Sequence, residues 1–275
     1  MAKILCPVDF SNTSLNALEY AVRIAESKKC VLTLLNVFTE HEFNKIVDKS
    51  SAVKTFKELL ALATKKLQNI AHEIIIESKA RGLVDCETIV ELGDLQDRIV
   101  EISSEGYDMI VMGTTGVGKN LIIGSNTSRV IQKSAIPVFC VPQQAGYEGF
   151  KRIVYATDVQ EADKMMIQRV VSFATFFQSR VNVLHVSQEG HEEEKGVVEE
   201  FFSDLKTFVP YNKISFESRT IHMELSQALL EYMEEIKGDL LVVYSKHRNF
   251  LEKIMHKSLT KKLSLIVNKP LFVIK

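Results

Sequence analysis

An internal repeat is the feature of this sequence that most restricts how the chain can fold. The segments KILCPVDFS (3–11) and RIVYATDVQ (152–160) each read as an apolar strand that ends in an aspartate, Asp9 or Asp158. These aspartates lie 149 residues apart, and the same spacing separates Val37 from Val186 in the next apolar run. A spacing that is kept across a strand, a helix and a second strand predicts two copies of one structural unit.

Apolar runs and helical patterns alternate in the same order in both copies. In the first copy we expect strands near 3–9, 31–37, 86–91, 107–113 and 136–141, and helices near 12–27, 51–82 and 94–104. In the second copy we expect strands near 152–158, 181–186, 214–219, 238–244 and 269–274, and helices near 161–177, 193–208 and 223–236. A further helical stretch precedes the last strand of each copy. This alternation predicts an α/β fold of two tandem Rossmann-like units, each a five-stranded parallel sheet flanked by helices.

The segment QQAGYEGF (143–150) has two glycines and no periodicity, so it reads as the linker between the copies. We therefore expect one domain over residues 1–146 and a second over 147–275.

The composition is that of a globular protein, with 46% hydrophobic and 25% charged residues. A formal net charge of -1 gives no argument for nucleic acid or for an anionic membrane as a partner. No apolar run is long enough for a membrane helix.

The four cysteines, Cys6, Cys30, Cys86 and Cys140, form no C-x-x-C pair and each lies in a stretch that reads as a strand. This pattern is typical of buried thiols in a reducing compartment, and it favours the cytoplasm.

No convergent set of metal ligands is evident in the sequence. The sequence also offers no G-x-S-x-G motif, no cysteine with a placed histidine and no evident general base. We therefore expect no catalytic residue and doubt that the chain is an enzyme.

The stretch GTTGVGKN (113–120) is the segment with the clearest chemical character. Its glycines follow a buried strand, and glycine lets backbone amides turn toward an anion. The frame G-x-x-x-x-G-K also fits a Walker A phosphate loop. That alternative is weak, because Asn120 stands where Ser or Thr should hold Mg²⁺ and Gly124-Ser125 would interrupt the helix that must follow. A plain strand-to-helix turn is the third interpretation.

The aspartate that closes the first strand, together with glycines after the fourth, resembles the universal stress protein family along nearly the whole chain. Nucleotide-binding members carry G-x-x-G-x(9)-G-[ST], and here Gly113-T-T-Gly116 is followed, after VGKNLII, by Gly124-Ser125. The spacer therefore has seven residues where the family has nine. The resemblance implies a sheet order of 3-2-1-4-5 and an adenine nucleotide alpha hydrolase-like fold.

The resemblance also implies an ATP-type site in the first copy, with Mg²⁺ as a tentative companion of the phosphates. Asp9 and the backbone near Val37 would meet the adenosine, and the glycine amides and Ser125 would meet the phosphates. The shorter loop favours ADP or AMP over ATP. The matching positions are Pro7, Val8, Asp9, Val37, Met112, Gly113, Gly116, Gly124, Ser125 and Asn126.

The second copy keeps the family's loop length but replaces the glycines with Tyr244, His247 and Lys257. Their side chains would occupy the space that phosphates need, so we expect no nucleotide there. Because single family units pair through their last strands, two units in one chain imply an internal pseudo-dimer and a further homodimer. The function implied is a cytoplasmic stress-response nucleotide sensor. The alternatives are an interaction scaffold for an unknown protein partner that binds no nucleotide, and a slow ATPase.

Overall fold

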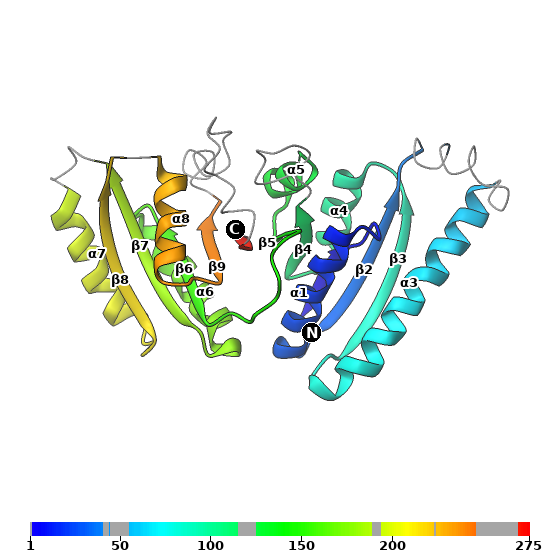
Figure 1. Cartoon of the computed structure of the whole chain (residues 1–275), viewed down its shortest axis with the longest axis horizontal. Coiled ribbons are helices and arrows are strands. Elements are labelled where there is room, and N and C mark those ends of the chain that lie inside the picture. The colour runs from blue at the N-terminus through cyan, green and yellow to red at the C-terminus, as the bar shows by residue number, and fades with distance from the viewer. Residues whose placement is uncertain are drawn as a thin grey trace. The chain divides into compact units, whose positions relative to one another are not determined.

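The chain forms two compact units in a computed structural model that describes residues 2–40, 44, 55–114, 125–188, 194–222, 224–245 and 269–275. Described residues up to Gln143 belong to the first unit, and those from Gln144 onward belong to the second (Figure 1). The domain boundary expected after Gly146 stays a prediction.

The first unit is a parallel sheet with helices on both faces (Figure 1). Its strands pair in the order β3-β2-β1-β4-β5. The elements are β1 (Lys3–Pro7), α1 (Asn12–Lys28), β2 (Val31–Phe38), α3 (Phe56–Ser78), the short 3-10 helix η1 (Lys79–Arg81), β3 (Asp85–Leu92), α4 (Leu95–Ser103), β4 (Met109–Thr114), α5 (Ser125–Lys133) and β5 (Val138–Pro142).

The second unit repeats this plan, with strands paired in the order β8-β7-β6-β9-β10. Its elements are β6 (Arg152–Thr157), α6 (Glu161–Phe177), β7 (Arg180–Gln188), α7 (Glu194–Phe208), β8 (Ile214–Ile221), α8 (Leu225–Glu235), β9 (Leu240–Tyr244) and β10 (Leu271–Ile274). Counted within each unit, both sheets have the order 3-2-1-4-5. The expected α/β fold of two tandem five-stranded parallel sheets is therefore confirmed.

Side-chain capping sets where several helices begin. The Ser11 side chain accepts a hydrogen bond from the Ser14 N–H at the start of α1, and Asp94 accepts from the Gln96 and Asp97 N–H groups at the start of α4. Thr55 forms a capping box with Glu58, so α3 begins at Phe56, later than the sequence pattern suggested. Residues 51–54 of the predicted helix lie outside the described residues.

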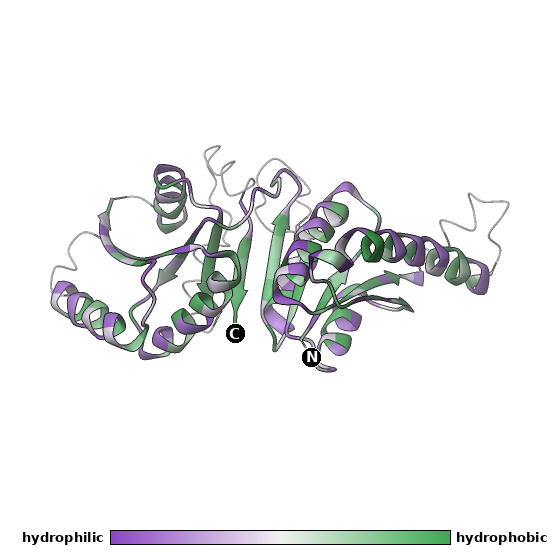
Figure 2. Cartoon of the chain, turned by 90° about the horizontal axis from the view of Figure 1, so that it is seen from below, coloured by the Kyte–Doolittle hydropathy of each residue, from purple (hydrophilic) through white to green (hydrophobic). Residues whose placement is uncertain are grey.

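The hydrophobic core lies along the central strands of each unit. Leu5, Ile110 and Val154 are fully buried, and the central strands are coloured as hydrophobic whereas the helices mix both kinds of residue (Figure 2). All four cysteines are buried and free, and burial raises the pKa of each thiol. The expectation that each lies in a strand was wrong for Cys30. Its N–H donates to the Ala25 carbonyl to close α1, so β2 begins one residue later.

No helix within the described parts of the chain is both long and apolar enough to cross a membrane.

Candidate functional site

A cavity of about 240 Å³ lies at the carboxyl edge of the first unit's sheet. Ligands of open α/β sheets bind at this edge, beyond the strand ends. The cavity lies where the ends of β1, β2 and β4 meet the first turns of α1, α4 and α5. Seven of the predicted ligand-binding residues line it: Pro7, Val8, Asp9, Val37, Met112, Gly113 and Asn126.

The other three predicted residues are placed differently. Ser125 is the exposed first residue of α5 and is not among the residues lining the cavity. Gly116 and Gly124 lie outside the described residues, as does Lys119 of the Walker-like frame. The structure therefore describes the strand-end wall of the cavity and the start of α5, and the proposed phosphate loop stays a prediction.

Asp9 is fixed at the mouth of the cavity by a tight turn. The Ser11 N–H donates to Asp9 Oδ1 at 2.9 Å, and the Asp9 N–H donates to Ser14 Oγ at 3.3 Å. Phe10, between them, has a φ of 64°, a left-handed conformation that holds the turn closed. Partial burial tends to raise the pKa of Asp9, but hydrogen bonds from Ser11 and Ser14 outweigh it and the pKa lies below its ordinary value. Asp9 is thus an ionised acceptor suited to ribose hydroxyl groups.

Gly113 is required by the packing of α1 against β4. A Cβ built on Gly113 would lie 2.8 Å from both the Cγ2 atom and the carbonyl oxygen of Thr13. The Thr127 hydroxyl donates to the Gly113 carbonyl at 3.2 Å and so ties α5 to the same strand end. The glycine therefore brings two helix N-termini close to one point, and it does so without a positive φ.

A side-chain bridge joins α4 to α5 beside the cavity. The Gln96 Nε2 group donates to Asn126 Oδ1 at 2.7 Å, and Arg129 Nη1 donates to Gln96 Oε1 at 3.1 Å. Gln96 is only 7% exposed, so its amide is held in one orientation. The bridge fixes Asn126, which the sequence pattern identified, through Gln96, which the pattern did not.

Ten residues that line the cavity were not predicted from the sequence, although two of them stand in recognisable helix-capping positions. Ser11 and Asp94 are helix caps, and an Asx or Ser residue before a helical pattern can be read as one. The others needed the fold, because their nearness to Asp9 depends on strand pairing. The ten are Ser11, Thr13, Ser14, Leu35, Thr39, Asp94, Leu95, Gln96, Ile99 and Thr127.

The second unit replaces this arrangement at the equivalent strand end. Tyr244 stands in place of Gly113 and is 7% exposed, and Ala162 stands in place of Thr13. Asp163 stands in place of Ser14 and is fully buried, where it accepts hydrogen bonds from the hydroxyls of Tyr155 (2.5 Å) and Thr157 (2.8 Å). The predicted side chains at 247 and 257 lie outside the described residues.

The cavity combines apolar and polar walls in a way that suits a nucleoside. Leu35, Val37, Ile99 and Met112 offer apolar surface for a flat heterocycle, and Asp9 offers a charged acceptor beside it. Within the described part of the chain, no group of three or more His, Cys, Asp or Glu residues is arranged to hold a metal ion.

The strand order and the position of the cavity define an α/β protein of the Rossmann-like class. A universal stress protein family model matches residues 1–142 and again 149–275, so the chain belongs to the universal stress protein family as a tandem of two units.

Individual relatives agree with this assignment. Universal stress protein MJ0577 of Methanocaldococcus jannaschii is 32% identical over 155 residues, which is 52% of this chain and 95% of that protein. Universal stress protein YxiE of Bacillus subtilis is 30% identical over 156 residues, 50% of this chain and 97% of that protein. The crystal structure of a universal stress protein from Archaeoglobus fulgidus has the same fold, with a TM-score of 0.69, 19% identity and coverage of 99% of this chain and 98% of that one.

Proposed function

We propose that the first unit binds an adenine nucleotide and that the protein is a cytoplasmic, nucleotide-responsive stress protein. The observation that supports this most directly is the convergence of residues from three strand ends and α5 on one cavity. Those strand ends are distant in sequence, and Asp9, Val37 and Gly113, which line the cavity, are also positions that the sequence alone predicts as ligand-binding. If the glycine segment served only to connect β4 to α5, there would be no reason for residues at the ends of β1 and β2 to line the same cavity.

The size of the cavity indicates which part of the nucleotide it holds. At about 240 Å³ it is smaller than the roughly 300–1,000 Å³ typical of ligand pockets. It therefore suits the nucleoside, while the phosphates extend toward α5 and the glycine segment. The N-terminus of α5 favours a negative charge, and Mg²⁺ would accompany the phosphates. The shorter glycine spacer leads us to propose that ADP or AMP binds better than ATP.

Calorimetric titration of the full chain with ATP, ADP, AMP and adenosine, with and without Mg²⁺, tests the proposal. We expect saturable binding of one nucleotide per chain. Asp9→Ala should weaken it about tenfold, because a charge-assisted hydrogen bond to the ribose is lost. The matched control is Asp158→Ala, which removes the equivalent aspartate from the second unit and should leave the affinity unchanged.

A second pair of variants tests the location independently of charge. Val37→Phe should fill the cavity and abolish binding, whereas Val186→Phe changes the equivalent position in the second unit and should not. A thermal melt of each variant identifies any that is unfolded. If folded wild-type protein gives no heat with any of the four compounds, the nucleotide proposal fails.

The scaffold alternative has one structural argument in its favour. Gly113 is explained by its packing against Thr13 even without a ligand. The same titration decides between the two functions, and a turnover assay with Mg²⁺ then separates a sensor from a slow ATPase. We propose no turnover, because no general base is evident in the sequence and Asp9 would lie on the nucleoside side of the site. The internal pseudo-dimer, the homodimer and a protein partner also remain proposals, to be tested first by sedimentation of the full chain.

A further inference from the structure

A second pocket, of about 380 Å³, lies in the second unit at the amino edge of its sheet. Its lining comes from the first residues of β6 and β7 and from the end of α8: Arg152, Arg180, Asn182, Glu235, Ile236 and Lys237. This edge is opposite to the one that carries ligands in such folds. We propose that this pocket is a binding site for a phosphate-bearing small molecule with the charge of a pyrophosphate group.

The charges around the pocket are unbalanced. Arg152, Arg180 and Lys237 form no side-chain hydrogen bond or ion pair with any residue that the structure describes. The one carboxylate in the lining, Glu235, is already bound by both terminal nitrogens of Arg219 at 2.6 and 2.9 Å. Three cations therefore line the pocket, whereas Glu217 and Glu235 share the single positive charge of Arg219 and leave one negative charge beside it. The pocket and its wall together carry a formal charge of about +2.

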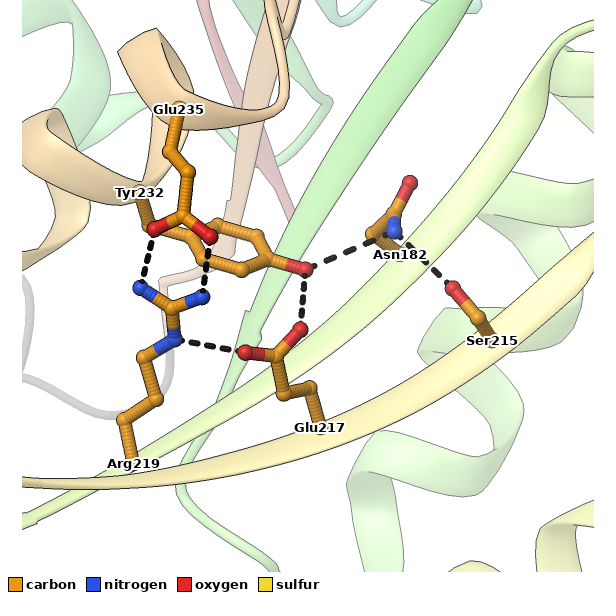
Figure 3. Close-up of polar contacts among 6 residues, drawn as sticks. All are labelled: Asn182, Ser215, Glu217, Arg219, Tyr232 and Glu235. Atoms are coloured by element: carbon orange, nitrogen blue, oxygen red, sulfur yellow. Dashed lines mark hydrogen bonds and ion pairs between the residues drawn. The ribbon is translucent and has the colours of Figure 1, made fainter.

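The wall of the pocket is held rigidly by the network in Figure 3. Arg219 Nε donates to Glu217 at 2.6 Å and the guanidinium lies 4.5 Å from the centre of the Tyr232 ring. The Tyr232 hydroxyl donates to Glu217 at 3.1 Å, and the Asn182 amide reaches that hydroxyl at 3.4 Å (Figure 3). Glu235 and Asn182 are thus fixed in place, and Glu235 is directed toward Arg219.

In the first unit, the cation at the equivalent position has a carboxylate partner. Lys3 pairs with Val31 across β1 and β2 as Arg152 pairs with Arg180 across β6 and β7. The cation is therefore kept on the first strand, and a second is added beside it where the first unit has valine.

The carboxylate that neutralises Lys3 is missing from the second unit. Glu87 forms an ion pair with Lys3 at 3.5 Å and accepts a hydrogen bond from Thr33. Strand pairing places Ser215 at the equivalent position, beside Asn182. The second unit has thus lost the carboxylate at this strand position, and an external anion could take its place beside Arg152.

The third cation is also specific to the second unit. Asp108 and Asp239 are equivalent, since each accepts a hydrogen bond from the N–H of the first residue of the central strand, Lys3 or Arg152. Two residues earlier the first unit has Gly106 (φ 89°) and the second has Lys237 (φ 54°). A glycine suits this left-handed position better, so the lysine is present at a conformational cost.

The size and charge of the pocket select the class of ligand. A formal excess of about two positive charges exceeds the single charge of a carboxylate and matches an anion with two or more charges. Two guanidinium groups offer the paired donors that phosphate oxygens accept. The pocket's volume fits a diphosphate group and not a folded protein segment, so a free diphosphate or a small molecule that carries one is the ligand.

The test is calorimetric titration of the full chain with pyrophosphate, in buffers of low and physiological ionic strength. We expect saturable binding of one pyrophosphate per chain, weakened by salt. Arg180→Gln should weaken it about tenfold, and Arg152→Gln combined with Arg180→Gln should abolish it. Lys151→Gln removes the same charge from an exposed neighbour outside the pocket and should change the affinity by less than about twofold. Arg219→Met should weaken binding as well, because Glu235 is then free to bind one of the pocket cations.

Two controls keep this site distinct from the proposed nucleotide site. Asp9→Ala and Val37→Phe should leave pyrophosphate binding intact, and the variants of the basic pocket should leave nucleotide affinity intact. The inference is wrong if pyrophosphate does not bind, if Lys151→Gln weakens binding as much as Arg180→Gln, or if Val37→Phe abolishes it. In that last case the anion binds in the first unit.

Discussion

The two units share one strand order but differ at the end of the fourth strand. In the first unit, Gly113 lets α1 approach β4 so closely that Thr13 leaves no room for a Cβ, and a cavity lies beside this contact. In the second unit, a tyrosine stands at the glycine position and an alanine at the threonine position. The fold is therefore compatible with either arrangement, and the cavity is a local property of a few residues.

A second difference concerns where polar groups are buried. The first turn of α1 presents Ser14 to the Asp9 turn, whereas the equivalent Asp163 is buried beneath the first turn of α6 with the hydroxyls of Tyr155 and Thr157. The first unit thus places a hydroxyl in the cavity wall at this position, and the second uses the equivalent side chain in a closed hydrogen-bond network. Each of the following predictions compares the two units at equivalent positions.

The largest effect is expected from Asp163→Ala. It leaves two buried hydroxyls without their acceptor, so the free energy of unfolding should fall by about 3 kcal/mol. Ser14→Ala, the matched change in the first unit, removes one neutral hydroxyl and leaves only the Asp9 N–H without its acceptor, so it should cost about 1 kcal/mol. Urea denaturation of the full chain measures both, and equal losses would contradict the view that the Asp163 network stabilises the second unit more than Ser14 stabilises the first.

The next largest effect is expected from Gly113→Ala. The new methyl group collides with Thr13, so the free energy of unfolding should fall by about 2 kcal/mol. Thr13→Ala should recover only part of this loss, because the Thr13 carbonyl oxygen also lies in the way. Full recovery in the double variant would show that the side chain alone requires the glycine.

A smaller, pH-dependent effect is expected from Glu26→Gln. The Glu26 carboxylate is 6% exposed and binds Arg81 at 2.7 Å. Its burial raises the pKa, but hydrogen bonds from Arg81, Ser78 and Arg23 outweigh this and the pKa lies below its ordinary value. The folded state therefore gains stability above the ordinary glutamate pKa, and that gain is lost as the pH falls through the lowered pKa.

We accordingly expect Glu26→Gln to destabilise the first unit at neutral pH and to differ less from wild type as the pH falls below about 4. The equivalent position in the second unit is Thr175, which carries no such pair. Hydrogen exchange of peptides from each unit, at pH 7 and pH 4, reads the two units separately. A constant difference between variant and wild type across this range would exclude the ionisation of Glu26 as the cause.

The sequence allowed the alternation of strands and helices, the repeat and several strand-end residues to be predicted, because these depend on local periodicity. Asp9 and Met112 could be identified because each ends or nearly ends an apolar strand. The partnership of Gly113 with Thr13, and of Gln96 with Asn126, could not be predicted. These pairs are brought together by strand order and helix packing, and nothing in their spacing along the chain indicates contact. The basic pocket was missed for the same reason, since its three cations come from distant segments.

The turn after the first strand of each unit has a consequence for protein engineering. Phe10 and Val159 stand at equivalent positions, and both have positive φ values, 64° and 56°. A β-branched residue is poorly suited to this conformation, which costs of order 1 kcal/mol or more. We therefore expect Val159→Gly or Val159→Asn to raise the free energy of unfolding without changing the core. The added stability would help the second unit to tolerate a Tyr244→Gly substitution that opens a cavity at the end of β9.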